Sequence, residues 1–218
     1  MNRENSENES EESKSKNVYK QFLRSCRCGK VEDVQSALQN VNATLKVIGL
    51  FDAIEYGKLG IVELLLENGV SINARDTNYR EDTVLHHAAT TNQVCVGLLK
   101  MLIQKGADVN AVTKCGKTAL HLAAALGYVD VTKVLIQNGA DVNAIDRNGY
   151  SPLTNAVDEY HVRCALHLLC SGAEIGASEY DLTLDRTGQL GKINSCLISL
   201  RNGRGVKPLM SDEERRFM

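Results

Sequence analysis

Histidine is the side chain most often used for acid–base chemistry and metal binding, and the sequence has five. His86 and His87 are adjacent, and neighbouring residues on a helix point in different directions. His161 and His167 are six residues apart, which does not match the i, i+4 spacing of a helical ligand pair. We therefore expect no catalytic or metal-binding role for these histidines.

The seven cysteines could in principle bind zinc or act as nucleophiles. Cys26 and Cys28 form C-x-C, which is shorter than the usual zinc-binding spacing, and no second pair matches it. Cys115 lies between Lys114 and Lys117, whose positive charge could favour a reactive thiol, but we interpret it as an incidental surface residue. An odd number of scattered cysteines indicates reduced thiols, and therefore a location in cytosol or nucleus.

Motifs for the common enzyme classes are missing from the sequence. It has no G-x-x-x-x-G-K-[ST], G-x-S-x-G, H-E-x-x-H or G-x-G-x-x-G. The adjacent carboxylates Asp158 and Glu159 are typical of a solvated helix end rather than an acid–base pair. We therefore predict no catalytic residue, no cofactor and no metal.

An internal repeat explains most of the sequence. LLLENGVSINA, MLIQKGADVNA and VLIQNGADVNA recur almost letter for letter, and Gly106, Gly139 and Gly172 are spaced by 33 residues. The interval from Gly69 to Gly106 is 37 residues, so this unit carries an insertion. Self-similarity at such a period is typical of solenoids, in which each unit buries its apolar face against its neighbours.

Within one unit, the residue types predict two short helices and an extended arm. Thr118 is a suitable N-cap for the first helix, and Gly127 is suited to the left-handed backbone that ends it. The second helix begins near Asp130, with apolar residues at i, i+3 and i+4, and ends at Gly139. The arm that follows contains a tight turn at Asn148–Gly149.

The period of about 33, together with TALHLAA and the GADVNA arms, resembles the ankyrin-repeat family over roughly residues 17–200. The resemblance implies an all-α repeat solenoid with short β-hairpin-like fingers and about six units, the terminal ones degenerate. We predict units over 17–40, 41–74, 75–111, 112–144, 145–177 and 178–200. It also implies that His86 and His121 brace turns, and that Asn110 and Asn143 bond the arm backbone, with hydroxylation at most secondary.

Both ends of the chain differ from the repeats. Residues 1–16 are acidic and serine-rich, and we expect them to be disordered. Residues 201–218 form a basic linker followed by a capping box that starts a helix. That helix either continues in a longer protein or docks on something, and the sequence leaves both alternatives open.

In this family, finger tips and first-helix faces line a concave groove that selects a protein partner. The residues that match those positions are Tyr79, Arg80, Lys114, Lys117, Leu126, Arg147, Asn148, Tyr150, Asp158 and Glu159. The third finger is two residues longer than the fourth, so we expect it to project furthest. The fingers together mix five cations with four carboxylates, and this balance predicts a partner that is slightly acidic if anything; the residues are Arg75, Arg80, Lys114, Lys117 and Arg147 against Asp76, Glu81, Asp82 and Asp146.

The leading hypothesis is therefore a non-enzymatic protein-binding adaptor, monomeric and located in cytosol or nucleus. Alternatives are the recognition arm of a larger protein, such as a ubiquitin-ligase adaptor or an effector, and an inhibitor that sequesters a transcription factor or kinase. A net charge of −2 argues against nucleic acid as partner, and no apolar run is long enough to span a membrane.

Overall fold

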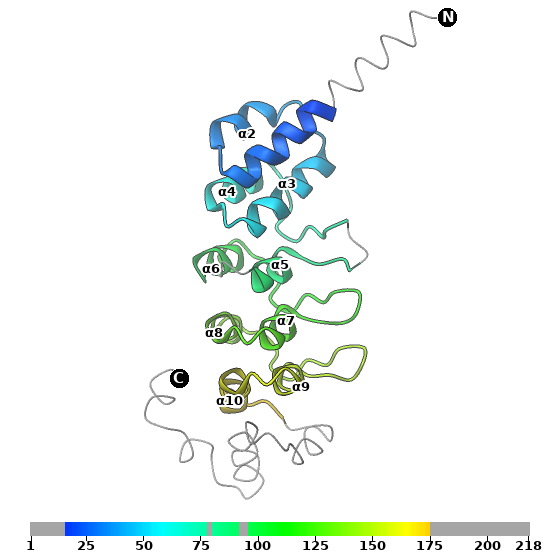
Figure 1. Ribbon diagram of the computed structural model, residues 1–218, viewed down its shortest axis with the longest axis vertical. Coiled ribbons are helices and arrows are strands. Elements are labelled where there is room, and N and C mark those ends of the chain that lie inside the picture. Colours follow the sequence, from blue (N-terminus) through cyan, green and yellow to red (C-terminus); the bar gives the residue numbers. More distant parts are fainter. Residues whose placement is uncertain (1–15, 78–79, 92–95, 175–218) are drawn as a thin grey trace, which may run out of the picture.

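A computed structural model describes residues 16–77, 80–91 and 96–174. Helices follow one another in antiparallel pairs that stack into an elongated solenoid (Figure 1). The first pair consists of a helix over residues 16–28 and α2 (Val31–Ala37). The remaining pairs are α3 (Ala43–Glu55) with α4 (Leu59–Glu67), α5 (Val84–Thr90) with α6 (Val96–Gln104), α7 (Ala119–Ala125) with α8 (Val129–Gln137), and α9 (Pro152–Asp158) with α10 (Val162–Cys170).

Local sequence signals set the ends of the short helices. The Thr118 hydroxyl accepts a hydrogen bond from the His121 backbone N–H, and the His121 ring accepts one from the Thr118 N–H, which completes a capping box at the start of α7. At the other end, Gly127 adopts φ +69°, as predicted. A β-carbon at Gly127 would also lie only 2.5 Å from the His161 ring, so this position requires glycine for two reasons.

The core is a continuous layer of small aliphatic side chains between stacked pairs. First helices contact one another along the row α3, α5, α7 and α9, and second helices along α6, α8 and α10. Leu50, Leu85, Leu120 and Leu153 occupy equivalent buried positions in successive first helices. Alanines beside them allow close approach of neighbouring helices. The fold is therefore an all-α repeat solenoid, as predicted.

The connecting fingers are hairpin-like loops. In each, a backbone N–H near the start donates to a carbonyl near the end: Asp76 to Asp82, Thr113 to Lys117, and Asp146 to Tyr150, all at 2.9 Å. Across the described residues the only β pairing is one antiparallel bridge between Arg75 and Thr83. The three fingers project to the same side of the stack, each one step below the last (Figure 1).

Several predictions fall on residues outside the described ranges. These are the disordered tail apart from Lys16, the sixth unit over 178–200, the C-terminal segment 201–218, and Tyr79. Lys16, which we assigned to the tail, is already helical. Among the described helices, none is long and apolar enough to cross a membrane.

Candidate protein-binding surface

The backbones of neighbouring fingers are joined to one another. The Lys114 N–H donates to the Arg80 carbonyl at 2.9 Å, and the Arg147 N–H donates to the Cys115 carbonyl at 3.1 Å. The Arg75 guanidinium adds a side-chain link, because it donates to the carbonyls of Glu81 and Val112, each at 2.9 Å. Finger positions are therefore fixed by hydrogen bonds between units, which come from backbone atoms and from the Arg75 side chain.

Buried histidines hold two of these fingers, residues 112–118 and 145–151, against the preceding first helix. His86 Nε2 lies 2.9 Å from the Lys117 carbonyl oxygen, and His121 Nε2 lies 3.0 Å from that of Tyr150. Since Nδ1 of each ring accepts from a backbone N–H, Nε2 carries the proton and donates. Burial lowers the pKa of both histidines, so the rings are neutral at pH 7. This confirms the bracing role that the resemblance implied.

Asparagines form a second ladder between successive arms. Asn110 accepts a hydrogen bond from the Asp141 N–H at 2.8 Å and donates to the Gly139 carbonyl at 2.9 Å. Asn143 makes the equivalent bonds to Glu174 and Gly172. Both amides therefore bond backbone of the next unit, as expected.

The acidic side chains of the fingers lie inside rather than at the surface. Asp76, Asp82 and Asp146 are all buried, and the Asp146 carboxylate accepts from the backbone N–H groups of Asn148 and Tyr150. Our count of these three aspartates as surface charges was wrong. Asp76 and Asp146 accept hydrogen bonds from backbone N–H groups of their own turns, and Asp82 contacts the Arg80 side chain. The exposed charges are therefore mostly positive.

The predicted partner-binding residues that the structure describes have surface positions. Arg80, Lys114, Arg147, Asn148, Tyr150, Leu126, Asp158 and Glu159 are exposed, and Lys117 is partly exposed. Two of the cations have intramolecular partners: Arg80 Nε lies 3.4 Å from Asp82, and Lys117 Nζ lies 3.9 Å from Asp146. We call the exposed side chains of the three fingers, over the described residues 75–77, 80–83, 112–118 and 145–151, the finger face.

Apolar side chains accompany the charges on the finger face. Val112 and Ile145 occupy the same place in successive fingers and are 45% and 60% exposed, and Tyr150 is 39% exposed. Tyr56, at the end of α3, is 46% exposed at the repeat position that Leu126 occupies in α7. Sequence reasoning overlooked Tyr56, although aligning the residue before Gly57 with the residue before Gly127 would have found it.

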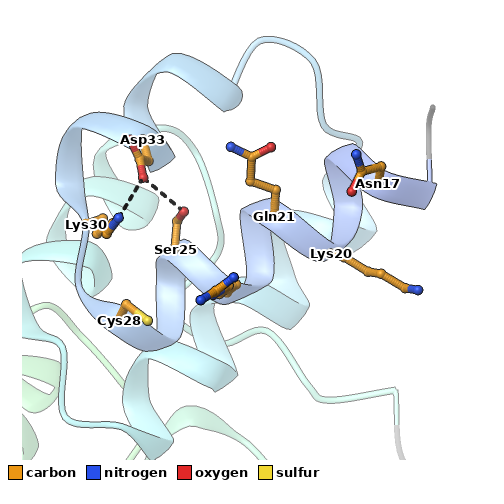
Figure 2. Close-up of a pocket in the computed structure, with 8 residues that line it drawn as sticks. Asn17, Lys20, Gln21, Ser25, Cys28, Lys30 and Asp33 are labelled. Carbon is orange, nitrogen blue, oxygen red and sulfur yellow. Dashed lines mark hydrogen bonds and ion pairs between the residues drawn. The ribbon is translucent and has the colours of Figure 1, made fainter.

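A separate pocket of about 440 Å³ opens at the N-terminal end of the stack. Figure 2 shows its lining, which includes Lys20, Lys30 and Asp33 from the first helix pair. Asp33 is already engaged, because its carboxylate accepts from Ser25 and pairs with Lys30 at 3.8 Å. This polar pocket brings together none of the predicted partner-binding residues.

The family model described as "Ankyrin repeats (3 copies)" matches residues 22–112, 50–146 and 85–179, which together cover most of the chain. The chain belongs to the ankyrin-repeat family. Ankyrin repeats are generally protein–protein interaction modules, and proteins of this family are typically non-enzymatic.

Among curated proteins, this ankyrin-repeat chain is similar to the human "Ankyrin repeat domain-containing protein 53". The two are 36% identical over 81 residues, which is 36% of this chain and 15% of the human protein. The chain therefore matches only a small part of that relative's length.

Proposed function

We propose that this ankyrin-repeat chain is a non-enzymatic adaptor that binds a partner protein on the concave side of the stack, across the finger face. The observation that carries the proposal is the separation of roles within each finger. Backbone amides, buried aspartates and histidines hold the finger in place, while Lys114, Arg147 and Tyr150 extend into solvent. Exposed Arg and Tyr side chains on a fixed backbone are common among residues that dominate binding energy.

The charge of the finger face supports a partner with acidic and apolar residues. Arg80, Lys114 and Arg147 are exposed cations, against the single exposed carboxylate of Glu81 on the described fingers. Val112 and Ile145 supply exposed apolar surface on two of the same fingers. Complementary charge raises the rate of association and disfavours basic partners, whereas the desolvated apolar contacts supply most of the affinity. Truncating a central residue of such a surface costs about 1–3 kcal/mol of binding free energy.

A comparative capture experiment tests the proposal. The full chain and the variant Arg80→Ala/Lys114→Ala/Arg147→Ala are each used to capture proteins from cell extract, and the captured proteins are quantified by mass spectrometry. The matched control replaces three exposed lysines away from the fingers, Lys20, Lys100 and Lys105, with alanine. Circular dichroism first establishes that all three proteins are folded.

We expect a specific partner to be retained by the control variant and lost, by at least about tenfold, in the finger variant. If the finger variant and the control retain the same partners equally, the finger face is not the binding surface. The convex side of the stack or the segments outside the repeats would then be examined in its place.

A second candidate is a recognition arm within a longer protein, such as a ubiquitin-ligase adaptor or an effector. The observation that favours it is the human relative, in which the matching repeats make up 15% of the length. An inhibitor of a transcription factor or kinase is a further variant of the same binding role. The identity of the captured partner separates these alternatives.

We further propose that the protein acts as a monomer in cytosol or nucleus, with neither nucleic acid nor membrane as its target. Cys28 and Cys115 are exposed free thiols, which suits a reducing compartment. Size-exclusion chromatography with light scattering tests the monomer, and localisation of a tagged full chain tests the compartment.

A further inference from the structure

Three side chains with metal-binding atoms meet at the base of the third finger. Asp76 and Asp82 come from the two sides of the finger, and His87 comes from α5 behind it. One carboxylate oxygen of each aspartate and one ring nitrogen of His87 all lie within 4.8 Å of one another. Both aspartates are buried, at 9% and 8% exposed, and His87 is partly buried.

The hydrogen bonds within this group leave one oxygen without a partner. Asp76 accepts from the Asp82 N–H at 3.1 Å and lies 3.0 Å from His87 Nε2. Asp82 Oδ2 lies 3.4 Å from Arg80 Nε, but Asp82 Oδ1 is buried from solvent and has no hydrogen-bond partner. A buried carboxylate oxygen without a donor is unfavourable, and a second carboxylate nearby adds repulsion that a bound cation would offset.

Comparison with the next two units shows that this arrangement is specific to the third. At the positions of Asp76, Asp82 and His87, the fourth unit has Thr113, Lys117 and Leu122, and the fifth has Asp146, Tyr150 and Asn155. Asp146, the fifth-unit counterpart of Asp76, has a structural role, because its carboxylate accepts hydrogen bonds from two backbone N–H groups of the turn. Asp82 and His87 have no counterpart of metal-binding type in either unit, so the architecture of the repeat does not explain them.

We propose that Asp76, Asp82 and His87 form a binding site for a divalent transition-metal ion, with Zn²⁺ as the best match. Imidazole nitrogen and carboxylate oxygen are both ordinary zinc ligands, and three protein ligands leave a fourth position for water. The mixed nitrogen and oxygen donors favour such an ion over Ca²⁺ or Mg²⁺, which prefer oxygen alone. Our expectation of no metal considered only histidine pairs and cysteine spacing, and neither test detects this group.

Phe51 and Arg80 border the site and define its surroundings. The Phe51 ring lies 4.7 Å from the His87 ring, centroid to centroid, and limits the positions that the imidazole can adopt. Arg80 must move away from Asp82 if both oxygens of that carboxylate turn toward the ion. If Asp82 Oδ1 alone binds the ion, Arg80, whose side chain is 48% exposed, keeps its contact with Oδ2.

Nuclear magnetic resonance of histidine ring nitrogens tests the site on the full chain. Zn²⁺ is titrated into ¹⁵N-labelled protein, and the His87 ring signals report binding at this place even if thiols elsewhere also bind zinc. Asp82→Asn removes one ligand charge, and Glu81→Gln removes the same charge from the adjacent exposed residue. This pair forms a matched comparison in which only Asp82 belongs to the group.

We expect saturable shifts of the His87 signals, unchanged affinity in Glu81→Gln, and affinity at least about tenfold weaker in Asp82→Asn. His87→Leu introduces the residue that the fourth unit has at this position, Leu122. This variant should lose the rise in melting temperature that Zn²⁺ produces in the parent protein. If Asp82→Asn does not fold, the thermal shift of His87→Leu tests the site in its place. The proposal is overturned if the His87 signals do not respond to Zn²⁺. It is equally overturned if the two single-charge variants bind alike, or if His87→Leu keeps the full thermal shift.

Discussion

Replacing His121 tests whether neutral histidines join successive units. The ring is fully buried, accepts from the Thr118 N–H at 3.1 Å, and lies 3.0 Å from the Tyr150 carbonyl oxygen of the next finger. The fifth unit has Thr154 at this place, which completes the same capping box with Ser151. His121→Thr should therefore keep the cap and lose the bond to the next unit, whereas His121→Ala loses both.

The expected magnitudes follow from which groups lose their partners. The Tyr150 oxygen also accepts from the Asp146 N–H, so loss of the imidazole costs that oxygen only one of two bonds, about 1 kcal/mol. The Thr118 N–H loses its ring acceptor only in the alanine variant, at about 1–3 kcal/mol, and alanine leaves a larger cavity than threonine does. We expect a loss of unfolding free energy of about 1.5 kcal/mol for His121→Thr and about 3–4 kcal/mol for His121→Ala.

The same histidine predicts a dependence on pH. Burial lowers the pKa of His121, so the unfolded chain takes up a proton before the folded chain does. Stability is therefore complete above the unfolded value of about 6.5 and falls as the pH drops below it. The slope that one such histidine contributes is at most about 1.4 kcal/mol per pH unit.

Urea unfolding, followed by circular dichroism between pH 7.5 and 5.5, measures both effects. The parent should lose stability on acidification more steeply than His121→Thr, which lacks the titrating ring. The reasoning is refuted if His121→Ala costs less than about 1 kcal/mol, or if the parent and His121→Thr show the same pH slope.

Two further predictions concern a glycine and the thiols. Gly127→Ala requires an unfavourable backbone conformation and displaces the His161 ring, so it should lower the free energy of unfolding in urea by about 2–3 kcal/mol. Gly139→Ala requires the same backbone conformation, but its new methyl group meets nothing within 4 Å, so it should cost only about 1 kcal/mol. Equal costs would mean that the contact with His161 is unimportant. Burial raises the pKa of Cys26 to about 12, whereas Cys28 is exposed. Iodoacetamide at pH 8 should therefore label Cys28 rapidly and Cys26 only in denaturant, as measured by peptide mass spectrometry. Rapid labelling of Cys26 in the folded chain would contradict the packing of the first helix pair.

The fold could be predicted from the repeated motifs because each motif has a local physical cause. Thr118 and His121 form a cap three residues apart, and Gly127 supplies a backbone conformation that other residues resist. Such interactions involve residues close in sequence, so spacing alone reveals them. The partners of His121 beyond its own helix were accessible only through the family resemblance, since Tyr150 lies 29 residues away.

Burial of the finger aspartates could not be predicted from composition or spacing. A carboxylate in a polar turn resembles a solvated charge in the sequence, whether it faces water or its own backbone. The structure decides this for Asp146, whose oxygen accepts from two amides inside the turn. Because Asp76, Asp82 and Asp146 are buried and not exposed as we had assumed, the charge of the finger face is mainly positive and not mixed.

The group at His87 was missed for a different reason. The test applied to the sequence asked whether histidines share a helix face, and the answer for His86 and His87 was correct. The partners of His87 are instead aspartates on the preceding finger, five and eleven residues earlier. No helical period links those positions, so only the folding of the finger against α5 brings them together.

The bonding between units also explains why the binding surface can vary without loss of the fold. The links between fingers use backbone atoms of Arg80, Lys114 and Arg147, and the side chains of those residues contribute little to them. Any other residue except proline could supply the same amide or carbonyl at these positions. Substitution of Lys114 or Arg147 should therefore change the partner while leaving stability nearly constant, whereas substitution at His86 or His121 should do the reverse. Arg80→Ala also removes the ion pair with buried Asp82 at 3.4 Å, so it should cost some stability as well. This separation is the physical basis for expecting the finger variant to remain folded and yet lose its partner.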